Sequence, residues 1–270
     1  MDLQVRRLRD AVVQWGPFVA RTAGYGALSC ALGPLSPRRS VSTWCMHRWC
    51  VTAADALGIR IALEGAENVP TRDRPAVLVA NHQSTLDILV LGAVLPIDYK
   101  WAAKKSLFWV PLLGWHLAIS GHVPIDRSKK NNAETVARRF DRALADGASL
   151  LMFPEGTRSE DGVMRPFRAG AFLSALRADV PIVPVVLDGT HWMMRKGEPI
   201  MDSSIPRDVR VRVLPAIPPH EAGTGTMRDR IDRLRATTHE RMAVALEQIG
   251  GRVERGTSRV ALDEPSLDLG

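Results

Sequence analysis

The strongest chemical signal in this 270-residue chain is a histidine and an aspartate five positions apart, directly after an apolar run. The run is residues 76–80, His82 stands in the segment that follows it, and Asp87 stands where the next apolar segment begins. Residues 84–87 read Ser-Thr-Leu-Asp, which matches the Ser/Thr-x-x-Asp pattern of a helix start. We therefore expect His82 in a loop and Asp87 in the first helical turn, where its carboxylate can accept the Nδ1 hydrogen. That leaves Nε2 as a general base for a substrate hydroxyl. The alternative is a helix cap beside a histidine that bonds only to backbone.

A second apolar run, 148–153, ends in a turn whose residue types suit an anionic substrate. Glu155, Gly156, Thr157 and Arg158 follow each other there. The glycine permits close backbone approach, and a guanidinium can hold two phosphate oxygens at once. The alternative is a turn with an exposed ion pair. Further cations for a phosphate precede it at Lys104, Lys105 and Arg127.

Short apolar runs alternate with helical patterns along the middle of the chain. This alternation predicts an α/β fold, with a mostly parallel central sheet flanked by helices and a ligand site at the carboxyl ends of the strands. Because Pro181 and Pro184 lack a hydrogen-bonding N–H, the run 180–187 is expected at a sheet edge or bulge. The predicted strands are 59–63, 76–80, 97–102, 148–153, 180–187 and 209–214, and the predicted helices are 85–95, 105–118, 131–146 and 168–178.

The ends of the chain differ from this pattern. Residues 1–57 predict two amphipathic helices interrupted at 33–37, with Trp and Arg among small apolar residues, as in helices that lie in a membrane interface. A helical hairpin packed on the main domain is the alternative. Residues 58–249 are the predicted catalytic domain and 250–270 a mobile tail. Within the domain, a basic helix after Pro219 is expected to turn one stripe inward: Ile231, Leu234, Met242, Leu246 and Ile249.

Composition limits the function classes. Lys and Arg number 36 against 29 Asp and Glu, a net charge of +7, and five of the six lysines lie between Lys100 and Lys130. Such basicity suits nucleic acid, an anionic membrane surface or an acidic substrate, but no nucleic-acid-binding pattern is present. Three cysteines without CxxC spacing favour a reducing compartment over a disulfide framework or a zinc site. No apolar run is long enough to span a bilayer, and Arg21 interrupts what would be a signal-peptide core.

The chain resembles the bacterial 1-acyl-glycerol-3-phosphate acyltransferases (lysophosphatidic acid acyltransferases) of the glycerolipid acyltransferase superfamily. Four blocks in order carry the resemblance: NHQSTLD at 81–87, GHVPIDR at 121–127, FPEGTRS at 153–159 and VPIVPVV at 180–186. It covers roughly residues 59–215.

The resemblance implies that His82 is the general base and Asp87 its orienting partner. It also implies that Lys104 or Lys105, Arg127, Glu155, Gly156, Thr157 and Arg158 hold the glycerol phosphate of a lysophospholipid acceptor. The implied reaction takes the acyl group from acyl-CoA or acyl carrier protein to the sn-2 hydroxyl, giving phosphatidic acid, with no metal and no cofactor. An enzyme of this kind is expected at the cytoplasmic face of the cell membrane, peripheral or monotopic.

Several alternatives stay open at this point. His191 follows Asp188 and could form a rival dyad. The Trp-rich segment 108–119 could line an acyl path, touch the bilayer or be a core helix. The acceptor could instead be glycerol-3-phosphate, another lysophospholipid or lyso-ornithine lipid. The protein could also be a non-catalytic lipid-binding protein, although such a protein would be expected to have lost His82 or Asp87.

Overall fold

The computed structural model describes residues 3–36, 40–125, 133–198, 201–202 and 204–254. The helices are α1 (Leu3–Leu32), α2 (Ser40–Ala56), α3 (Leu86–Val94), α4 (Leu113–Ile119), α5 (Ala133–Ala145), α6 (Gly170–Ala178), α7 (Thr190–Met193) and α8 (Met227–Gln248). The strands are β1 (Arg60–Glu64), β2 (Val77–Ala80), β3 (Tyr99–Lys100), β4 (Ala102–Lys104), β5 (Val123–Ile125), β6 (Ser149–Met152), β7 (Val163–Met164), β8 (Ile182–Asp188), β9 (Asp208–Val213) and β10 (Arg252–Val253).

The main sheet has the order β1-β9-β8-β2-β6-β3, and every neighbouring pair is parallel except β8 and β9. The predicted α/β class with a mostly parallel sheet is therefore confirmed. Because β8, β2 and β6 are parallel neighbours, their carboxyl ends meet at one edge of the sheet. The residues after these three strands are therefore brought together.

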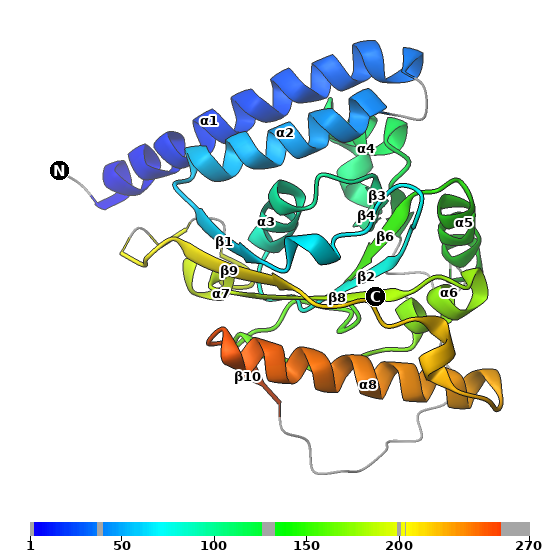
Figure 1. Cartoon of the computed structure of the whole chain (residues 1–270). Coiled ribbons are helices and arrows are strands. Elements are labelled where there is room, and N and C mark those ends of the chain that lie inside the picture. The colour runs from blue at the N-terminus through cyan, green and yellow to red at the C-terminus, as the bar shows by residue number, and fades with distance from the viewer. Residues whose placement is uncertain (1–2, 37–39, 126–132, 199–200, 203, 255–270) are drawn as a thin grey trace.

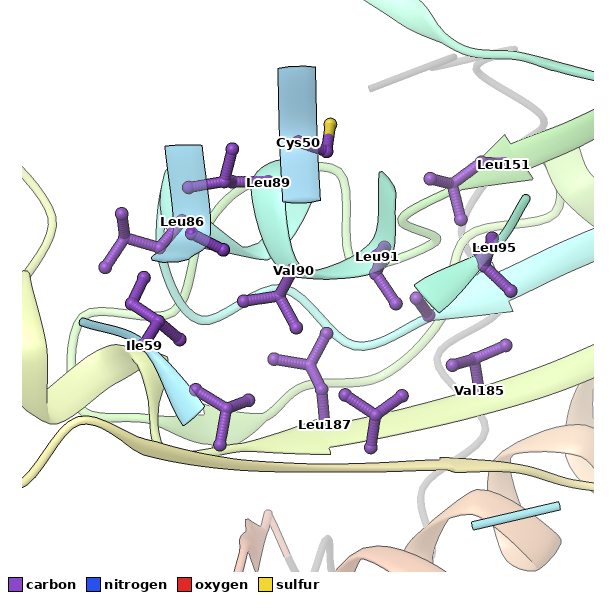
Figure 2. Packing of buried hydrophobic residues seen from close by; sticks show 14 of the residues in the cluster. Cys50, Ile59, Leu86, Leu89, Val90, Leu91, Leu95, Leu151, Val185 and Leu187 are labelled. Carbon is purple, nitrogen blue, oxygen red and sulfur yellow. The ribbon is translucent and has the colours of Figure 1, made fainter. Parts of the chain in front are cut away.

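Helices cover both faces of this sheet, as Figure 1 shows. On one face, α2 and α3 pack on Leu78, Val185 and Leu187; Figure 2 shows side chains of α3, such as Val90, close to Leu187. On the other face, α5, α6 and α8 pack on alternate strand residues such as Val79 and Val186. Burial on both faces explains why these strands are continuous apolar runs in the sequence.

Of the two positions expected for the 180–187 run, a sheet edge or a bulge, the edge is wrong and the bulge is found: three steps from Val185 to Ile182 face four steps from Val213 to Ile217. β8 lies inside the sheet, between β9 and β2. Pro184 is tolerated there because its carbonyl, which accepts from the Leu214 N–H at 2.8 Å, faces the β9 side, where β9 has already ended at Val213. Pairing resumes at the isolated bridge between Ile182 and Ile217. The missing N–H therefore falls in an interruption of the ladder.

Two further expectations are corrected by the connections beside the site. The single strand predicted over 97–102 is two short strands, with β3 in the main sheet and β4 paired to β5 in another. The helix predicted over 105–118 is a 3-10 turn, Lys105–Trp109, followed by α4. Pro111 and Leu112 separate them, and Leu112 has a φ of 64°.

The N-terminal segment forms the predicted pair of helices, which meet at a 3-10 turn, Gly33–Leu35. Figure 1 shows α1 and α2 side by side, above α3 and α4. None of the helices in the described part of the chain has the length and apolar character needed to cross a membrane.

The C-terminal helix α8 turns its predicted stripe inward: Leu234, Met242, Leu246 and Ile249 are buried and Ile231 is partly buried. Beyond it, β10 pairs with β7, so residues 252 and 253 of the predicted tail are attached to the domain. Residues 255–270 lie outside the described part.

Candidate active site

The loop that carries His82 is fixed to the neighbouring strand by the residue before it. Asn81 is fully buried, and its side-chain amide makes two hydrogen bonds to Leu187 of β8. Its Nδ2 donates to the Leu187 carbonyl and its Oδ1 accepts from the Leu187 N–H, each at 2.9 Å. The side chain thereby extends the β2–β8 pairing by one more step at the carboxyl edge of the sheet.

His82 and Asp87 form the expected pair. His82 Nδ1 donates to Asp87 Oδ2 at 2.7 Å, and Asp87 lies in the first turn of α3. The same oxygen accepts the backbone N–H groups of Gln83 at 2.7 Å and Ser84 at 2.9 Å, while Oδ1 accepts the Thr190 hydroxyl at 2.5 Å. Asp87 is therefore both a ligand of the loop backbone and the partner of the histidine.

The side chain of His82 lines a cavity. Its ring stacks on the ring of Phe153, with centroids 4.0 Å apart and planes 18° apart, and the side chain is 14% exposed. Because Nδ1 is held by a carboxylate, the proton on it is fixed there and Nε2 is the basic nitrogen. The arrangement can therefore accept a proton from a group bound in the cavity.

The turn after β6 holds His82 from the opposite side. The Ser159 N–H donates to the His82 carbonyl at 2.8 Å, and the His82 N–H donates to Glu155 Oε1 at 2.7 Å. Glu155 Oε2 accepts the Arg165 N–H at 3.0 Å. Burial raises the pKa of Glu155 to about 7, and these two N–H groups counteract the rise.

The cavity beside His82 has a volume of about 260 Å³ and a partly basic wall. Lys104, Arg158 and Arg168 line it together with Gly156. Gly156 has a φ of 76°, which favours glycine, and a Cβ there would lie 2.6 Å from Arg168 Nε, so a larger residue would also displace this guanidinium. Such a set of donors suits a phosphate.

The other residues expected to bind phosphate do not all lie at the cavity. Arg158 donates to the Thr85 hydroxyl at the mouth of the cavity. Lys105 and Thr157 are exposed, and Glu155 is turned to backbone. Arg127 lies outside the described residues. Sequence reasoning missed Arg168; it is the first residue of the helix predicted over 168–178 and lies two residues before α6, and no motif singled it out.

A second, apolar cavity of about 220 Å³ adjoins the first, and both are lined by Thr85, Ile88, Trp101 and Leu107. Residues of α1, α2 and α4 complete its wall. His116, whose pKa is lowered to about 4 mainly by burial, is one of its few polar residues. Part of the Trp-rich segment 108–119 thus lines an apolar cavity that adjoins the cavity beside His82.

The rival dyad does not form. His191 is buried against Gly162, and within the described part of the chain its Nδ1 has no hydrogen-bond partner. Burial also lowers its pKa. Its neighbour Thr190 instead serves Asp87.

Comparisons with known proteins match the chain to acyltransferases. Residues 60–188 match the family model described as Acyltransferase. The 1-acyl-sn-glycerol-3-phosphate acyltransferase of Saccharomyces cerevisiae is 33% identical over 84% of this chain and 73% of its own length. The protein of the same description from Pseudomonas aeruginosa is 31% identical over 90% of this chain and 91% of its own length.

One solved structure shares the fold over nearly the whole chain. It is the 1-acyl-sn-glycerophosphate (LPA) acyltransferase, PlsC, of Thermotoga maritima, with a TM-score of 0.77 and 23% identity. The match covers 95% of this chain and 99% of that one. This structure shares the fold, and the two relatives above show that the chain is an acyltransferase and belongs to the 1-acyl-sn-glycerol-3-phosphate acyltransferase family.

Proposed function

We propose that the protein transfers a fatty acyl group from a thioester to the sn-2 hydroxyl of 1-acyl-glycerol-3-phosphate, with His82 as general base. The observation that carries this proposal is the 2.7 Å bond between His82 Nδ1 and buried Asp87, with the His82 side chain lining the cavity. His82 Nε2 takes the hydroxyl proton while the acceptor oxygen bonds to the thioester carbonyl carbon. The carbon–sulfur bond then breaks, and the imidazolium returns the proton to the departing thiolate.

Direct transfer suits the residues at hand. A thioester is already activated, so no covalent acyl-enzyme is needed, whereas an alcohol attacks slowly without a base. A positioned general base contributes about 10²–10⁴-fold. The Asp87 carboxylate holds the imidazole in the productive tautomer and stabilises the imidazolium that forms.

The phosphate of the acceptor is placed at the basic wall of the cavity beside His82. Lys104, Arg158 and Arg168 line that wall together, and a dianionic phosphate accepts charge-assisted hydrogen bonds from such groups. Lys105 and Arg127 are candidates by family resemblance. When the phosphate binds, the Arg158 guanidinium exchanges the Thr85 hydroxyl for phosphate oxygens.

A fatty acyl chain is assigned to the apolar cavity. Since the two cavities share wall residues such as Ile88 and Leu107, a chain bound in the apolar one can present its carbonyl carbon at His82. Acyl-CoA and acyl carrier protein both deliver a thioester and are the two candidate donors. The lysophospholipid acceptor brings its own chain from the bilayer.

The helical hairpin is assigned to an anionic membrane surface, at the cytoplasmic face where both candidate donors are made. Between 12 and 35, the exposed residues whose side chains the structure describes are all Val, Ala, Gly, Leu or Pro. Nearby, Trp115 is 55% exposed in α4, which packs against α1, and Trp109 is 79% exposed at the end of the 3-10 turn before it. Exposed apolar and tryptophan side chains of this kind are typical of peripheral or monotopic proteins that lie in a membrane interface.

The decisive experiment compares His82→Ala with His191→Ala in the purified protein. Each is assayed with acyl-CoA and acyl carrier protein donors against 1-acyl-glycerol-3-phosphate, glycerol-3-phosphate, other lysophospholipids and lyso-ornithine lipid. We expect transfer to 1-acyl-glycerol-3-phosphate that only His82→Ala abolishes. Turnover near the unmodified level by folded His82→Ala protein would refute the mechanism, and inactivity with every phosphate-bearing acceptor would refute the substrate.

A further inference from the structure

We propose that Glu155 is a positioning residue that holds the backbone of His82, and that it does not bind the acyl acceptor. This inference rests on the proposed role of His82 as the base. It departs from the expectation that the whole 155–158 turn is a phosphate site. Within that turn it divides the work: Arg158 faces the substrate, and Glu155 faces the protein.

The two oxygens of Glu155 are already engaged. Oε1 accepts the His82 N–H at 2.7 Å and Oε2 accepts the Arg165 N–H at 3.0 Å. The residue is 5% exposed. Its neighbours Pro154 and Gly156 are among the residues that line the cavity beside His82, whereas Glu155 is not. A buried carboxyl group between two backbone donors would have to give up one of these hydrogen bonds in order to touch a substrate, and in its ionised form it would repel a phosphate.

The Glu155 carboxyl group makes one of two hydrogen bonds that fix the backbone of His82. The His82 carbonyl accepts the Ser159 N–H at 2.8 Å, so the turn after β6 grips the histidine through both its N–H and its carbonyl. On the other flank, the Asp87 carboxylate holds the imidazole and the next two N–H groups. With backbone and ring both fixed, little freedom remains for Nε2.

The far end of the Glu155 contact is itself anchored. Arg165 directly follows β7, which pairs with β10, and the Glu254 N–H donates to the Met164 carbonyl at 3.0 Å. The Arg165 guanidinium adds ion pairs to Asp161 at 2.7 Å and Glu254 at 3.2 Å. Glu155 therefore connects the histidine to a fixed strand pair and not to a free loop.

The consequence concerns turnover more than binding. Misplacing a catalytic group by about 1 Å can cost about 100-fold in rate. Glu155→Gln keeps one accepting oxygen but presents an NH₂ group to the second backbone N–H. Glu155→Ala removes both acceptors. We therefore expect kcat to fall about tenfold in Glu155→Gln and about 100-fold in Glu155→Ala, with the acceptor KM within about twofold of its original value.

The matched control is Glu160→Gln, which removes an exposed carboxylate of the same segment that pairs only at the surface, with Lys196 at 2.9 Å. Kinetics are measured for donor and acceptor separately in each variant. An acceptor KM raised tenfold or more with kcat retained in Glu155→Gln would overturn the proposal, because that is the signature of a lost acceptor ligand.

A second measurement does not depend on activity. In full-length protein labelled with [¹⁵N]histidine, the backbone amide resonance of His82, assigned by its loss in His82→Ala, reports the hydrogen bond to Glu155. We expect it to move upfield in Glu155→Ala, which removes both accepting oxygens, and to stay in place in Glu160→Gln. An unmoved resonance in folded Glu155→Ala would overturn the positioning role. Failure of the base assignment alone would show instead as activity in His82→Ala.

Discussion

Replacing Asp87 by asparagine separates the two tasks of this residue. In the wild-type protein, Oδ2 accepts three N–H groups and Oδ1 accepts the Thr190 hydroxyl. An asparagine oxygen in the place of Oδ2 keeps the three N–H bonds, and its NH₂ group can donate to the Thr190 oxygen. The geometry of the loop is therefore retained in Asp87→Asn while the negative charge is lost.

The magnitudes differ between asparagine and alanine. Without the charge, the imidazolium that forms during transfer loses its partner, so we expect kcat to fall by about 10²–10⁴-fold in Asp87→Asn. Its stability should fall by only about 1–2 kcal/mol, since the bonds remain. Asp87→Ala leaves buried donors from Gln83, Ser84 and Thr190 without an acceptor. At about 1–3 kcal/mol each, this is a large part of the stability of a typical domain.

Steady-state kinetics and denaturant unfolding of both variants test this reasoning. Asp229→Asn is the matched control, because Asp229 also accepts at a helix start, in the capping box of α8, but on a fully different surface. We expect Asp229→Asn to leave kcat unchanged. If folded Asp87→Asn retained more than about a tenth of the wild-type kcat, Asp87 would be only a helix-start ligand and the dyad would be refuted.

Three further predictions concern the phosphate, the membrane and pH. Arg158→Ala should raise the acceptor KM by about tenfold or more and the donor KM little, in steady-state assays; equal rises would contradict the phosphate assignment. Replacing Trp109 and Trp115 together by serine should weaken binding to anionic phospholipid vesicles by about tenfold in sedimentation assays. The control Trp192→Ser, at a different exposed tryptophan, should not weaken it. Unchanged binding in the double variant would contradict a membrane contact at these two tryptophans. Because the pKa of Glu155 rises from 4.5 to about 7 on folding, the stabilisation from its protonation is complete below pH 4.5 and is lost as the pH rises through 7. Relative to Glu155→Gln, the free energy of unfolding should therefore fall by about 3 kcal/mol between pH 4.5 and 8 in denaturant titrations, and parallel pH curves would contradict the buried acid.

The sequence predicted best the parts of the fold that depend on local pattern. The apolar runs behind His82 and Glu155 are buried strands, and Asp87 lies in the first turn of α3 and accepts the Ser84 N–H, although Thr85 is the N-cap and makes no side-chain cap hydrogen bond. These features repeat a simple rule: a strand buried on both faces is apolar throughout, and a helix starts with a residue that can accept backbone N–H groups.

What the sequence did not predict depends on partners distant in the chain. Pro184 indicated a sheet edge or a bulge, and the sequence could not decide between them, because the bulge is formed by residues 213–217 on the neighbouring strand. The hydrogen bonds of Glu155 depend on Arg165 and on the β7–β10 pair. Arg168 lines the cavity beside Gly156, whose lack of a Cβ leaves room for the guanidinium. The residue types of Glu155 and Arg168 indicate which hydrogen bonds they can make, but the direction of each side chain is set by tertiary contacts.

The ties between the histidine loop and the β8–α7 region have a consequence for the order in which the enzyme forms. Asn81 bonds to Leu187 across 106 positions, Asp87 to Thr190 across 103, and Ser84 to Met194 across 110. Contacts this distant form late in folding, because the entropy of closing a long loop is lost before they contribute. During synthesis the dyad lacks these supports until about 190 residues have emerged from the ribosome. If His82 is the base, as proposed, the nascent chain is expected to stay inactive until β8 and α7 have joined the His82 loop.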